Sequence, residues 1–349
     1  MSHGYNTVNW TRFKKKYDRW AFLGIVLYLV VFIATTMVSQ PAGQSYSTPQ
    51  VLIRATGSLA FIMLTFILCI GPLARISTRF IPLLYNRRHL GVMTFFIALL
   101  HAALVIFWYH SFGVLNPIVS LLASNPAYDS IAGFPFESLG VVALILMFVL
   151  AATSHDFWNS VLGPGLWKAI HMSVYVVYIL LVAHILLGVL QFEKNPVYLG
   201  LIIATAATVS FLHLYSAILS RSPSPETNSD GWMKVAPSNA FEEDKAKIVT
   251  PEKGESIAVF LHEGKISAVS NVCRHQGGPL GEGRVVDDCI TCPWHGFQYR
   301  LEDGQSPPPF TEKIATYATK VDDGVVYVQA NGNPAGTPQK PSLLEIHQS

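Results

Sequence analysis

The chain of 349 residues is long enough for two domains, and its composition, 51% apolar and 13% charged, is far from that of an average soluble protein. The formal net charge of +2 and the lack of a basic, aromatic-rich stripe give no indication of a nucleic-acid partner. Four cysteines are too few for a disulfide framework and are consistent with a reducing compartment.

The N-terminal segment is basic and precedes an apolar run at residues 21–38. A cleaved signal peptide is the competing interpretation, because such peptides also have basic residues before an apolar region. The run is eighteen residues long, no A-x-A site follows it, and no twin-arginine export signal precedes it. We therefore expect residues 1–20 to form a cytoplasmic N-terminus and the run to be a first transmembrane helix.

Five more apolar segments follow, each near the ~20 residues that are needed to cross about 30 Å of hydrocarbon. The fourth of the six predicted spans is the weakest. Residues 21–220 are thus predicted to form an all-α six-helix membrane bundle, which returns the chain to the side of its N-terminus. The predicted spans are residues 21–38, 51–73, 90–110, 139–153, 166–190 and 197–219.

Basic residues in the short loops indicate the orientation of the bundle. They gather before the first helix, between the second and third helices, and after the sixth, whereas the opposite loops contain only Lys194. We therefore expect the N-terminus and the C-terminal domain to face the cytoplasm. The basic residues on that side are Arg12, Lys14, Lys15, Lys16, Arg19, Arg75, Arg79, Arg87, Arg88 and Arg221.

Histidines lie in or beside three of the predicted helices, where an ionisable side chain is costly and marks a candidate functional site. A single intramembrane histidine also serves to hydrogen-bond a neighbouring helix. Several on facing helices favour haem b, whose iron binds imidazoles on both faces of the ring. They are His89, His101 and His110 on the third helix, His171 and His184 on the fifth, and His213 on the sixth.

Two imidazoles that bind one haem must lie at the same depth in the membrane. We take Arg88 and Lys168 as the inner ends of the third and fifth helices. At about 1.5 Å per residue, His101 then lies roughly 20 Å deep and His184 roughly 24 Å deep. The sequence therefore predicts that His101 and His184 hold one haem.

A second, shallower haem site would pair His89, at roughly 1.5 Å, with His171, at roughly 5 Å. His171 and His184 are thirteen positions apart, which is not a whole number of helical turns, so an ideal helix places them roughly 140° apart around its axis. Geometry alone therefore does not require two stacked haems. His110 lies at the predicted outer interface beside two aromatic residues, and we expect it to belong to an aromatic belt. The role of His213 stays open.

Two stretches of the chain resemble the ferric reductase-like transmembrane family. One is the segment RRHLGV, which begins at Arg87 and leads to His101, and the other is the segment LWKAIH, which ends at His171 and leads to His184. The resemblance covers roughly residues 21–219. It implies a six-helix bundle that holds haem b at positions matching His101, His171 and His184 and, through the bacterial members, a bacterial cytoplasmic membrane. His89 departs from the bacterial pattern, so one haem is expected and a second is left open.

Beyond the sixth helix, residues 221–230 have the polar, proline-containing composition of a linker. Short apolar runs follow, separated by turn residues such as Glu263-Gly264. Residues 231–330 are therefore predicted to form a small all-β domain with antiparallel strands. Residues 331–349 are expected to form a disordered tail.

Two loops of this β domain each pair one cysteine with one histidine, as Cys273-x-His275 and Cys292-x-x-His295. Two thiolates and two imidazoles form the ligand set of a 2Fe–2S centre in which the cysteines bind one iron and the histidines the other. A tetrahedral zinc site uses the same ligand types, but usually takes two cysteines from one loop. Cys289 lies outside the paired pattern and is treated as a bystander.

Residues 271–300, which contain both loops, resemble the Rieske family and in particular its ferredoxin-like branch, and the resemblance extends over about residues 231–330. High-potential members have a disulfide between the loops and a serine soon after the second histidine, whereas this chain has Gly278, Trp294 and Phe297 at those places. Tyr299 matches the hydrogen-bonding tyrosine of the family. Because fewer groups donate to the sulfurs, we expect a potential of roughly −150 to +100 mV.

The sequence lacks a G-x-G-x-x-G fingerprint, so we expect electrons to come from a separate cytoplasmic NAD(P)H-dependent reductase or a ferredoxin. The expected function is single-electron transfer between the cluster, through an exposed edge of His275 or His295, and haem b. The acceptor would be quinone, ferric iron, oxygen or an extracytoplasmic redox protein, and reverse flow stays open. Two alternatives are a haem-free bundle that anchors a ferredoxin for a cytoplasmic oxygenase, and a redox sensor.

Overall fold

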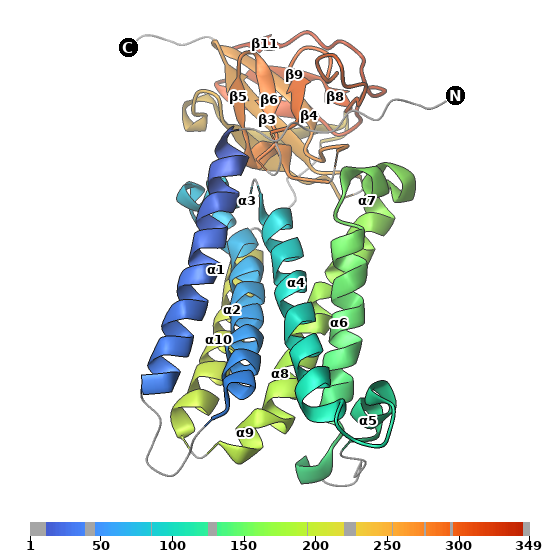
Figure 1. The fold of residues 1–349 in the computed structure, drawn as a ribbon. Coiled ribbons are helices and arrows are strands. Elements are labelled where there is room, and N and C mark those ends of the chain that lie inside the picture. The colour runs from blue at the N-terminus through green and yellow to red at the C-terminus, as the bar shows by residue number, and fades with distance from the viewer. Residues whose placement is uncertain are drawn as a thin grey trace, which may run out of the picture.

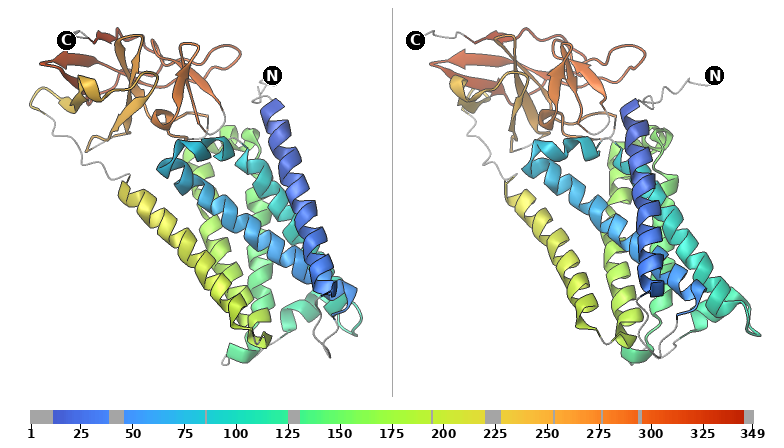
Figure 2. Two further views of the ribbon diagram at one scale, coloured as in Figure 1. Left: turned by 90° about the vertical axis from the view of Figure 1, so that its left-hand side faces the viewer. Right: turned by 60° about the vertical axis from the view of Figure 1, so that its left-hand side comes forward.

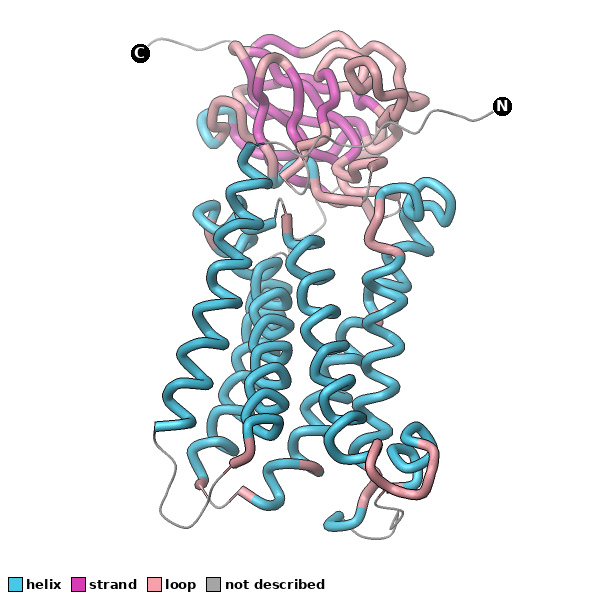
Figure 3. The backbone as a smooth tube through the Cα atoms, viewed as in Figure 1, coloured by secondary structure: helices cyan, strands magenta, loops and turns pink. Residues whose placement is uncertain are grey.

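The computed structural model describes residues 12–38, 46–84, 86–124, 131–193, 195–219, 228–252, 254–275, 277–293 and 296–344. Helices occupy the first part of the chain and strands the second (Figure 3). The β domain covers one end of the helical bundle (Figures 1 and 2). The start of α1 (Arg12–Val38) and the end of α10 (Pro196–Leu219) lie at this same end.

The helical part confirms a multi-pass membrane bundle. Within the described residues, five helices are long and apolar enough to cross a membrane, and the shorter apolar helix α6 (Phe136–Ala152) lies at the place of the fourth predicted span. The expected fifth helix is divided, because the backbone at Gly188 (φ −103°, ψ −109°) is not helical. The remaining helices are α2 (Thr48–Ile76), η1 (Thr78–Phe80), α3 (Ile81–Leu84), α4 (Arg87–Val105), η2 (Ile106–His110), α5 (Pro117–Ala123), η3 (Ile131–Gly133), α7 (Asp156–Met172), α8 (Val174–Leu187) and α9 (Val189–Phe192).

Apolar side chains fill the centre of the bundle and also cover its outside. Phe61 of α2 stacks on Tyr178 of α8, with ring centroids 5.5 Å apart, and Phe95 and Met147 add to the same core from α4 and α6. Large apolar side chains such as Phe211 are exposed on the outer faces. An apolar exterior over helices of this length suits a hydrocarbon solvent, in which helices satisfy their own backbone groups.

The β domain consists of three antiparallel sheets. One has the order β1-β10-β9, the second β11-β4-β3-β2 with β8 beside β4, and the third β5-β6-β7. Two short 3-10 helices, η4 (Ser238–Ala240) and η5 (Leu280–Glu282), lie between strands. The strands are β1 (Trp232–Pro237), β2 (Ala246–Val249), β3 (Ile257–His262), β4 (Lys265–Ser270), β5 (Arg284–Val286), β6 (Cys289–Thr291), β7 (Gln298–Arg300), β8 (Thr316–Tyr317), β9 (Thr319–Asp322), β10 (Val325–Gln329) and β11 (Ser342–Leu343).

The C-terminal segment departs from the expected disordered tail, because the chain is folded as far as Leu344. Strand β11 pairs with β4, where Ser342 lies opposite Ile266. Backbone hydrogen bonds fix the segment before it, from Asn333 N to the Thr316 carbonyl (2.8 Å) and from Gln339 N to the Glu302 carbonyl (2.9 Å). A two-residue strand is too short to produce a periodic sequence pattern, which is why the prediction missed it.

An ion pair connects the β domain to the helical bundle. Arg75, in the last turn of α2, places Nε 3.8 Å from Oε1 of Glu282, and its Nη1 donates a hydrogen bond of 3.4 Å to Ser216 of α10. Burial raises the pKa of the Glu282 carboxyl, although Arg75 acts against this shift. Glu282 belongs to η5, which follows the Cys273 loop, so this loop lies on the side of the β domain that contacts the helices.

His262 links two hairpins of the β domain and should make its stability depend on pH. Its Nδ1 lies 2.7 Å from Asp244 and its Nε2 3.0 Å from Asp288. Partial burial lowers the pKa of His262, but hydrogen bonds with Asp288 and Asp244 raise it overall above the ordinary value. A raised folded-state pKa gives stability that is complete below about pH 6.5 and is lost as the pH rises through the folded-state pKa.

We therefore expect the unfolding temperature of the β domain to fall above about pH 6.5 in the full-length protein, and to fall less in His262→Gln. Loss of the visible cluster absorbance on heating measures it at each pH. Other titrating groups are common to both proteins, so the difference between the two curves reports His262 alone. Parallel curves would contradict this role.

Candidate iron–sulfur and haem sites

The two cysteine-bearing loops of the β domain have the same turn. In the first, Cys273 N donates to the Gly278 carbonyl (2.8 Å) and Gly277 N donates to the Cys273 carbonyl (2.7 Å). In the second, Cys292 N donates to the Phe297 carbonyl (2.8 Å) and Gly296 N to the Cys292 carbonyl (2.9 Å). The glycine four residues after each cysteine has a φ of 71°, which favours glycine. The loops therefore offer their cysteines in equivalent positions.

The two thiols lie together in the core of the β domain, each 1% exposed. Burial raises the pKa of the Cys273 thiol, but hydrogen bonds with Cys292 and Tyr299 and the nearby His275 lower it to about 7. The Tyr299 hydroxyl lies 3.5 Å from Cys273 Sγ and accepts a hydrogen bond from Arg274 N at 2.9 Å. A thiol with a lowered pKa, beside a second buried thiol and a hydroxyl, suits a thiolate-bound metal centre.

His275 lies beside the cysteines. We expected an exposed edge at His275 or at His295, and His275 does not provide it. It is 6% exposed and stacks on Phe297, with ring centroids 4.9 Å apart and planes 5° apart. The partner ligand His295 lies outside the described residues, as does Trp294. Phe297 also contacts Phe310, whose ring centroid is 4.8 Å away. An extended aromatic contact, which motif spacing cannot predict, thus covers one ring of the ligand set.

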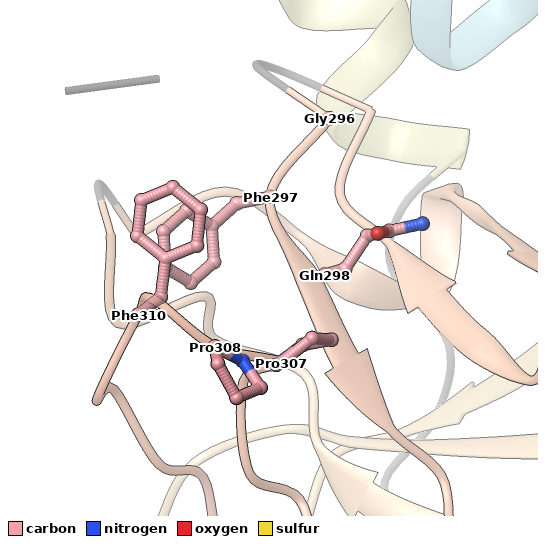
Figure 4. Close-up of a pocket in the computed structure, with 6 residues that line it drawn as sticks. All are labelled: Gly296, Phe297, Gln298, Pro307, Pro308 and Phe310. Carbon is pink, nitrogen blue, oxygen red and sulfur yellow. The ribbon is translucent and has the colours of Figure 1, made fainter. Parts of the chain in front are cut away.

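A small cavity of about 110 Å³ adjoins this aromatic contact. Figure 4 shows the rings of Phe297 and Phe310 side by side, with two prolines below them. Its position beside the second cysteine loop makes it an approach to the cluster region for a small apolar group. The lining residues are Gly296, Phe297, Gln298, Pro307, Pro308 and Phe310.

Cys289 differs from the two ligand cysteines in its surroundings. It lies on β6, opposite Arg300 of β7, and is 9% exposed. Burial and the negative charges of Asp288 and Asp287 raise the pKa of its thiol. A thiol that is held protonated is a poor metal ligand, and this agrees with the prediction that Cys289 is a bystander.

In the helical bundle, His101 and His184 have equivalent environments. His101 Nδ1 is 3.0 Å from the carbonyl oxygen of Ile53 on α2, and His184 Nδ1 is 2.8 Å from the carbonyl oxygen of Phe136 on α6. A carbonyl only accepts hydrogen bonds, so it fixes the ring proton on Nδ1 and leaves the Nε2 lone pair for a metal. This arrangement fits bis-imidazole haem iron.

His101 and His184 belong to α4 and α8, which both pack against α2 and α6. Each imidazole is partly buried. These contacts support the pairing of His101 with His184 that helix depth predicts.

A glycine lies against each of these imidazoles. Each glycine follows, by one helical turn, the residue whose carbonyl contacts the imidazole, which is Ile53 for His101 and Phe136 for His184. A Cβ on Gly57 would lie 2.8 Å from His101 Cε1, and a Cβ on Gly140 would lie 3.0 Å from His184 Cε1. None of these four positions, Ile53, Gly57, Phe136 and Gly140, was predicted from the sequence. Glycine within an apolar helix costs about 1 kcal/mol relative to alanine, so each glycine was a signal of close packing.

We expect Gly57→Ala and Gly140→Ala to turn the adjacent imidazole and to weaken haem retention about 10-fold, as loss of an outer-shell contact does. Haem content and the electron paramagnetic resonance signal of low-spin ferric haem, which depends on the orientation of the axial rings, measure the effect. Gly91→Ala on α4 is the matched control, because a Cβ there meets nothing within 4 Å. An unchanged signal in both variants would show that these glycines do not position the rings.

The other intramembrane histidines have different partners. His89 Nδ1 lies 2.9 Å from Asp18 of α1, and His171 Nδ1 lies 3.0 Å from the carbonyl of Trp167, on whose ring it stacks at 3.8 Å. His89 therefore contacts α1, whereas His171 contacts its own helix, α7. A second haem held by these two histidines stays a prediction. His213 uses both ring nitrogens, with the Tyr175 hydroxyl and the Val209 carbonyl each 2.9 Å away, so it connects α10 to α8.

His110 is not part of an aromatic belt, and this prediction is wrong. The side chain is 6% exposed, Nδ1 lies 3.0 Å from Ser120 Oγ, and Nε2 lies 3.4 Å from Glu137 Oε1. The local cause is η2, which is a π-helix and not a continuation of α4. Nine residues of α-helix would turn His110 about 180° away from His101, whereas one π turn reduces this angle to about 80°.

Comparison with known proteins assigns both parts of the chain. Residues 231–318 match the model of the Rieske [2Fe-2S] domain, and residues 56–182 match that of the ferric reductase like transmembrane component. The "Protein-methionine-sulfoxide reductase heme-binding subunit MsrQ" of Herminiimonas arsenicoxydans is 31% identical over 159 residues, which is 45% of this chain and 67% of that protein.

Two further relatives match a smaller share of the chain. The "Cholesterol 7-desaturase nvd 1" of Ciona intestinalis is 36% identical over 96 residues, 27% of this chain, but the match spans only 20% of the desaturase. Among solved structures, the Sphingomonas yanoikuyae B1 ferredoxin is 24% identical, with a TM-score of 0.26, and the match covers 29% of this chain and 98% of the ferredoxin.

The chain is a membrane electron-transfer protein, because a Rieske domain implies a 2Fe–2S cluster and a ferric reductase-like bundle implies haem b. It belongs to the ferric reductase-like transmembrane family, and a Rieske domain follows its bundle.

Proposed function

We propose that this protein passes single electrons between a Rieske cluster at the cytoplasmic face of a bacterial membrane and haem b inside the bilayer. The observation that carries the proposal is the presence, on one chain, of two equivalent cysteine loops and two imidazoles with equivalent carbonyl partners. When bound, the cluster and the haem supply the one-electron redox change. The chain supplies ligand geometry, electrostatics and exclusion of water.

Five residues of the β domain and two histidines of the bundle have assigned roles in this proposal. Cys273 and Cys292 bind one iron as thiolates, and His275 and His295 bind the other. The Tyr299 hydroxyl, 3.5 Å from Cys273 Sγ, tunes the potential by donating to the sulfur. His101 and His184 hold haem iron through Nε2, with the carbonyls of Ile53 and Phe136 fixing the ring orientation.

The cytoplasmic orientation follows from charge. Arg75, Arg87 and Arg88 lie on the helix ends that the β domain covers, and Arg88 donates a hydrogen bond of 2.6 Å to the Ser154 carbonyl there. Basic residues gather on the cytoplasmic side of membrane proteins. The Arg75–Glu282 pair fixes the Rieske domain to this same side.

Electrons enter in this proposal from a separate cytoplasmic NAD(P)H-dependent reductase or a ferredoxin. The cavity beside Phe297 and Phe310 adjoins the cluster loops and offers such a donor an aromatic contact. Haem held by His101 and His184 would pass electrons toward the outer side, to quinone, ferric iron or an extracytoplasmic redox protein. The similarity to a methionine-sulfoxide reductase heme-binding subunit favours the last of these acceptors.

The test is a cofactor count followed by a kinetic measurement on the purified full-length protein. We expect two irons and two labile sulfides of the cluster plus one haem b per chain, with a second haem as the outcome if His89 and His171 also bind. Photoreduction of the cluster should be followed by reduction of haem, and Cys292→Ser should abolish this step. Haem that is never reduced through the cluster would contradict the proposal.

A second candidate function, a haem-free anchor for a Rieske ferredoxin that serves an oxygenase, is favoured by similarity of part of the chain to an oxygenase component and to desaturases. In that case purified protein would have no b-type absorption band. His101→Ala would then leave electron delivery to a soluble oxygenase unchanged.

A further inference from the structure

A polar cluster, buried at its histidine and partly buried at its other members, lies at the end of the bundle opposite the β domain. It consists of His110 on η2, Ser120 and Ser124 next to or on α5, and Glu137 in the first turn of α6. His110 is 6% exposed, and the Glu137 side chain 14%. His110 Nε2 lies 3.4 Å from Glu137 Oε1, and its Nδ1 lies 3.0 Å from Ser120 Oγ. Ser124 Oγ donates to the other carboxylate oxygen, Oε2.

Three separate elements converge to build this cluster. The π turn of η2 rotates His110 inward, and α5, whose N-terminus is capped by the Asn116 side chain, brings the two serines to it. A buried carboxylate and imidazole are costly unless they are paired and hydrogen-bonded. His110 Nε2 is buried and lies 3.4 Å from Glu137 Oε1, without a hydrogen bond to another group of the described structure.

The cluster is connected directly to one proposed haem ligand. Glu137 is adjacent in sequence to Phe136, whose carbonyl oxygen lies 2.8 Å from His184 Nδ1. One turn of α6 therefore orients the imidazole through its backbone and carries the buried carboxylate. In a medium of low dielectric constant, a change of one charge at the metal strongly alters the affinity of a nearby carboxylate for protons.

We propose that Glu137 and His110 form a proton-binding site that gains one proton from the outer side when the haem held by His101 and His184 is reduced, and loses it on oxidation. In the balanced step, one electron from the reduced cluster converts ferric to ferrous haem, and one proton from the outer aqueous phase converts the Glu137 carboxylate to the carboxylic acid. No other bond forms or breaks. The inference rests on the proposed haem site.

Few other ionisable groups of the described residues face this site. His101 on α4 and His184 on α8 are the proposed ligands, and Tyr109 of η2 is 55% exposed. Arg54 of α2 forms a separate pair with Glu193, at 3.8 Å, and lies over the Tyr46 ring at 4.3 Å. Glu193 therefore provides a matched control: an acidic residue on the same side of the bundle, with its own cationic partner.

The experiment is a redox titration of haem b in the purified full-length protein between pH 5.5 and 9, with proton uptake measured by an indicator dye. Wild-type protein and Glu193→Gln should take up close to one proton per electron within part of this range, which is a shift of about 59 mV per pH unit. Glu137→Gln should take up close to none, and His110→Asn should move the pH range in which uptake occurs.

Infrared difference spectra provide a second readout, because reduction should produce a carboxylic acid band that Glu137→Gln lacks. A potential that is independent of pH in the wild type, or a slope that persists in Glu137→Gln with an intact haem spectrum, would overturn the inference. If Glu137→Gln fails to fold, three results still test the inference: the pH dependence of the wild-type haem potential, the wild-type infrared band and the behaviour of His110→Asn. Absence of haem would instead refute the proposed function.

Discussion

Replacing His101 or His184 by alanine is expected to remove haem b from the full-length protein while leaving the cluster in place. Each imidazole has its Nδ1 proton fixed by a carbonyl on a neighbouring helix, so each presents Nε2 with little loss of freedom. Without either ring, one face of the iron loses its ligand. We expect haem per chain to fall at least about 10-fold, measured by reduced-minus-oxidised absorption and extracted haem.

The matched control for these variants is His213→Gln. His213 also lies within the bilayer, but both of its ring nitrogens are occupied, by the Tyr175 hydroxyl and the Val209 carbonyl. It should retain the haem and lose only a connection between α8 and α10. Full haem content in both alanine variants would place the ligands elsewhere, and His171 and His89 would then be the next candidates.

Cys292→Ser is expected to abolish the 2Fe–2S cluster, whereas Cys289→Ser is expected to keep it. The two cysteines are three residues apart and both buried, so they differ mainly in backbone and electrostatics. Cys292 begins a turn that Gly296 closes, beside Cys273, while the Cys289 thiol lies on a strand where burial and Asp288 raise its pKa. Iron, labile sulfide and the electron paramagnetic resonance signal of the reduced cluster should fall to background only in Cys292→Ser.

Haem content offers an internal control for this pair, because the bundle supplies both of its ligands. It should stay at the wild-type value in both serine variants. Loss of the cluster in Cys289→Ser would mean that the thiol has a structural or ligand role that its strand position does not indicate.

The iron–sulfur loops could be predicted from sequence because their geometry is local. Cys273, Gly277, Cys292 and Gly296 form two copies of one turn, in which each glycine has the positive φ that its position requires. The transmembrane segments were also predictable, since hydropathy over about 20 residues reflects the solvent around the helix. Helix depth predicts His184 as the partner of His101, and this pairing stays a prediction.

Other features depend on contacts between distant elements and had no local signal. The carbonyls that contact the proposed haem ligands come from Ile53 and Phe136, each 48 residues from its histidine. The burial of His110 depends on a π turn, which changes the helical phase without a recognisable motif. The burial of His275 depends on tertiary contacts such as the ring of Phe297 from the other loop.

The contact between Arg75 and Glu282 has a kinetic consequence. Because the β domain is covalently part of the bundle and rests on it, the proposed electron transfer from cluster to haem would be a unimolecular event, and dilution of the protein should not slow it. Only arrival of the external donor obeys second-order kinetics. Turnover should therefore rise with donor concentration to a plateau that belongs to the chain itself, and moderate salt should affect the rising part more than the plateau.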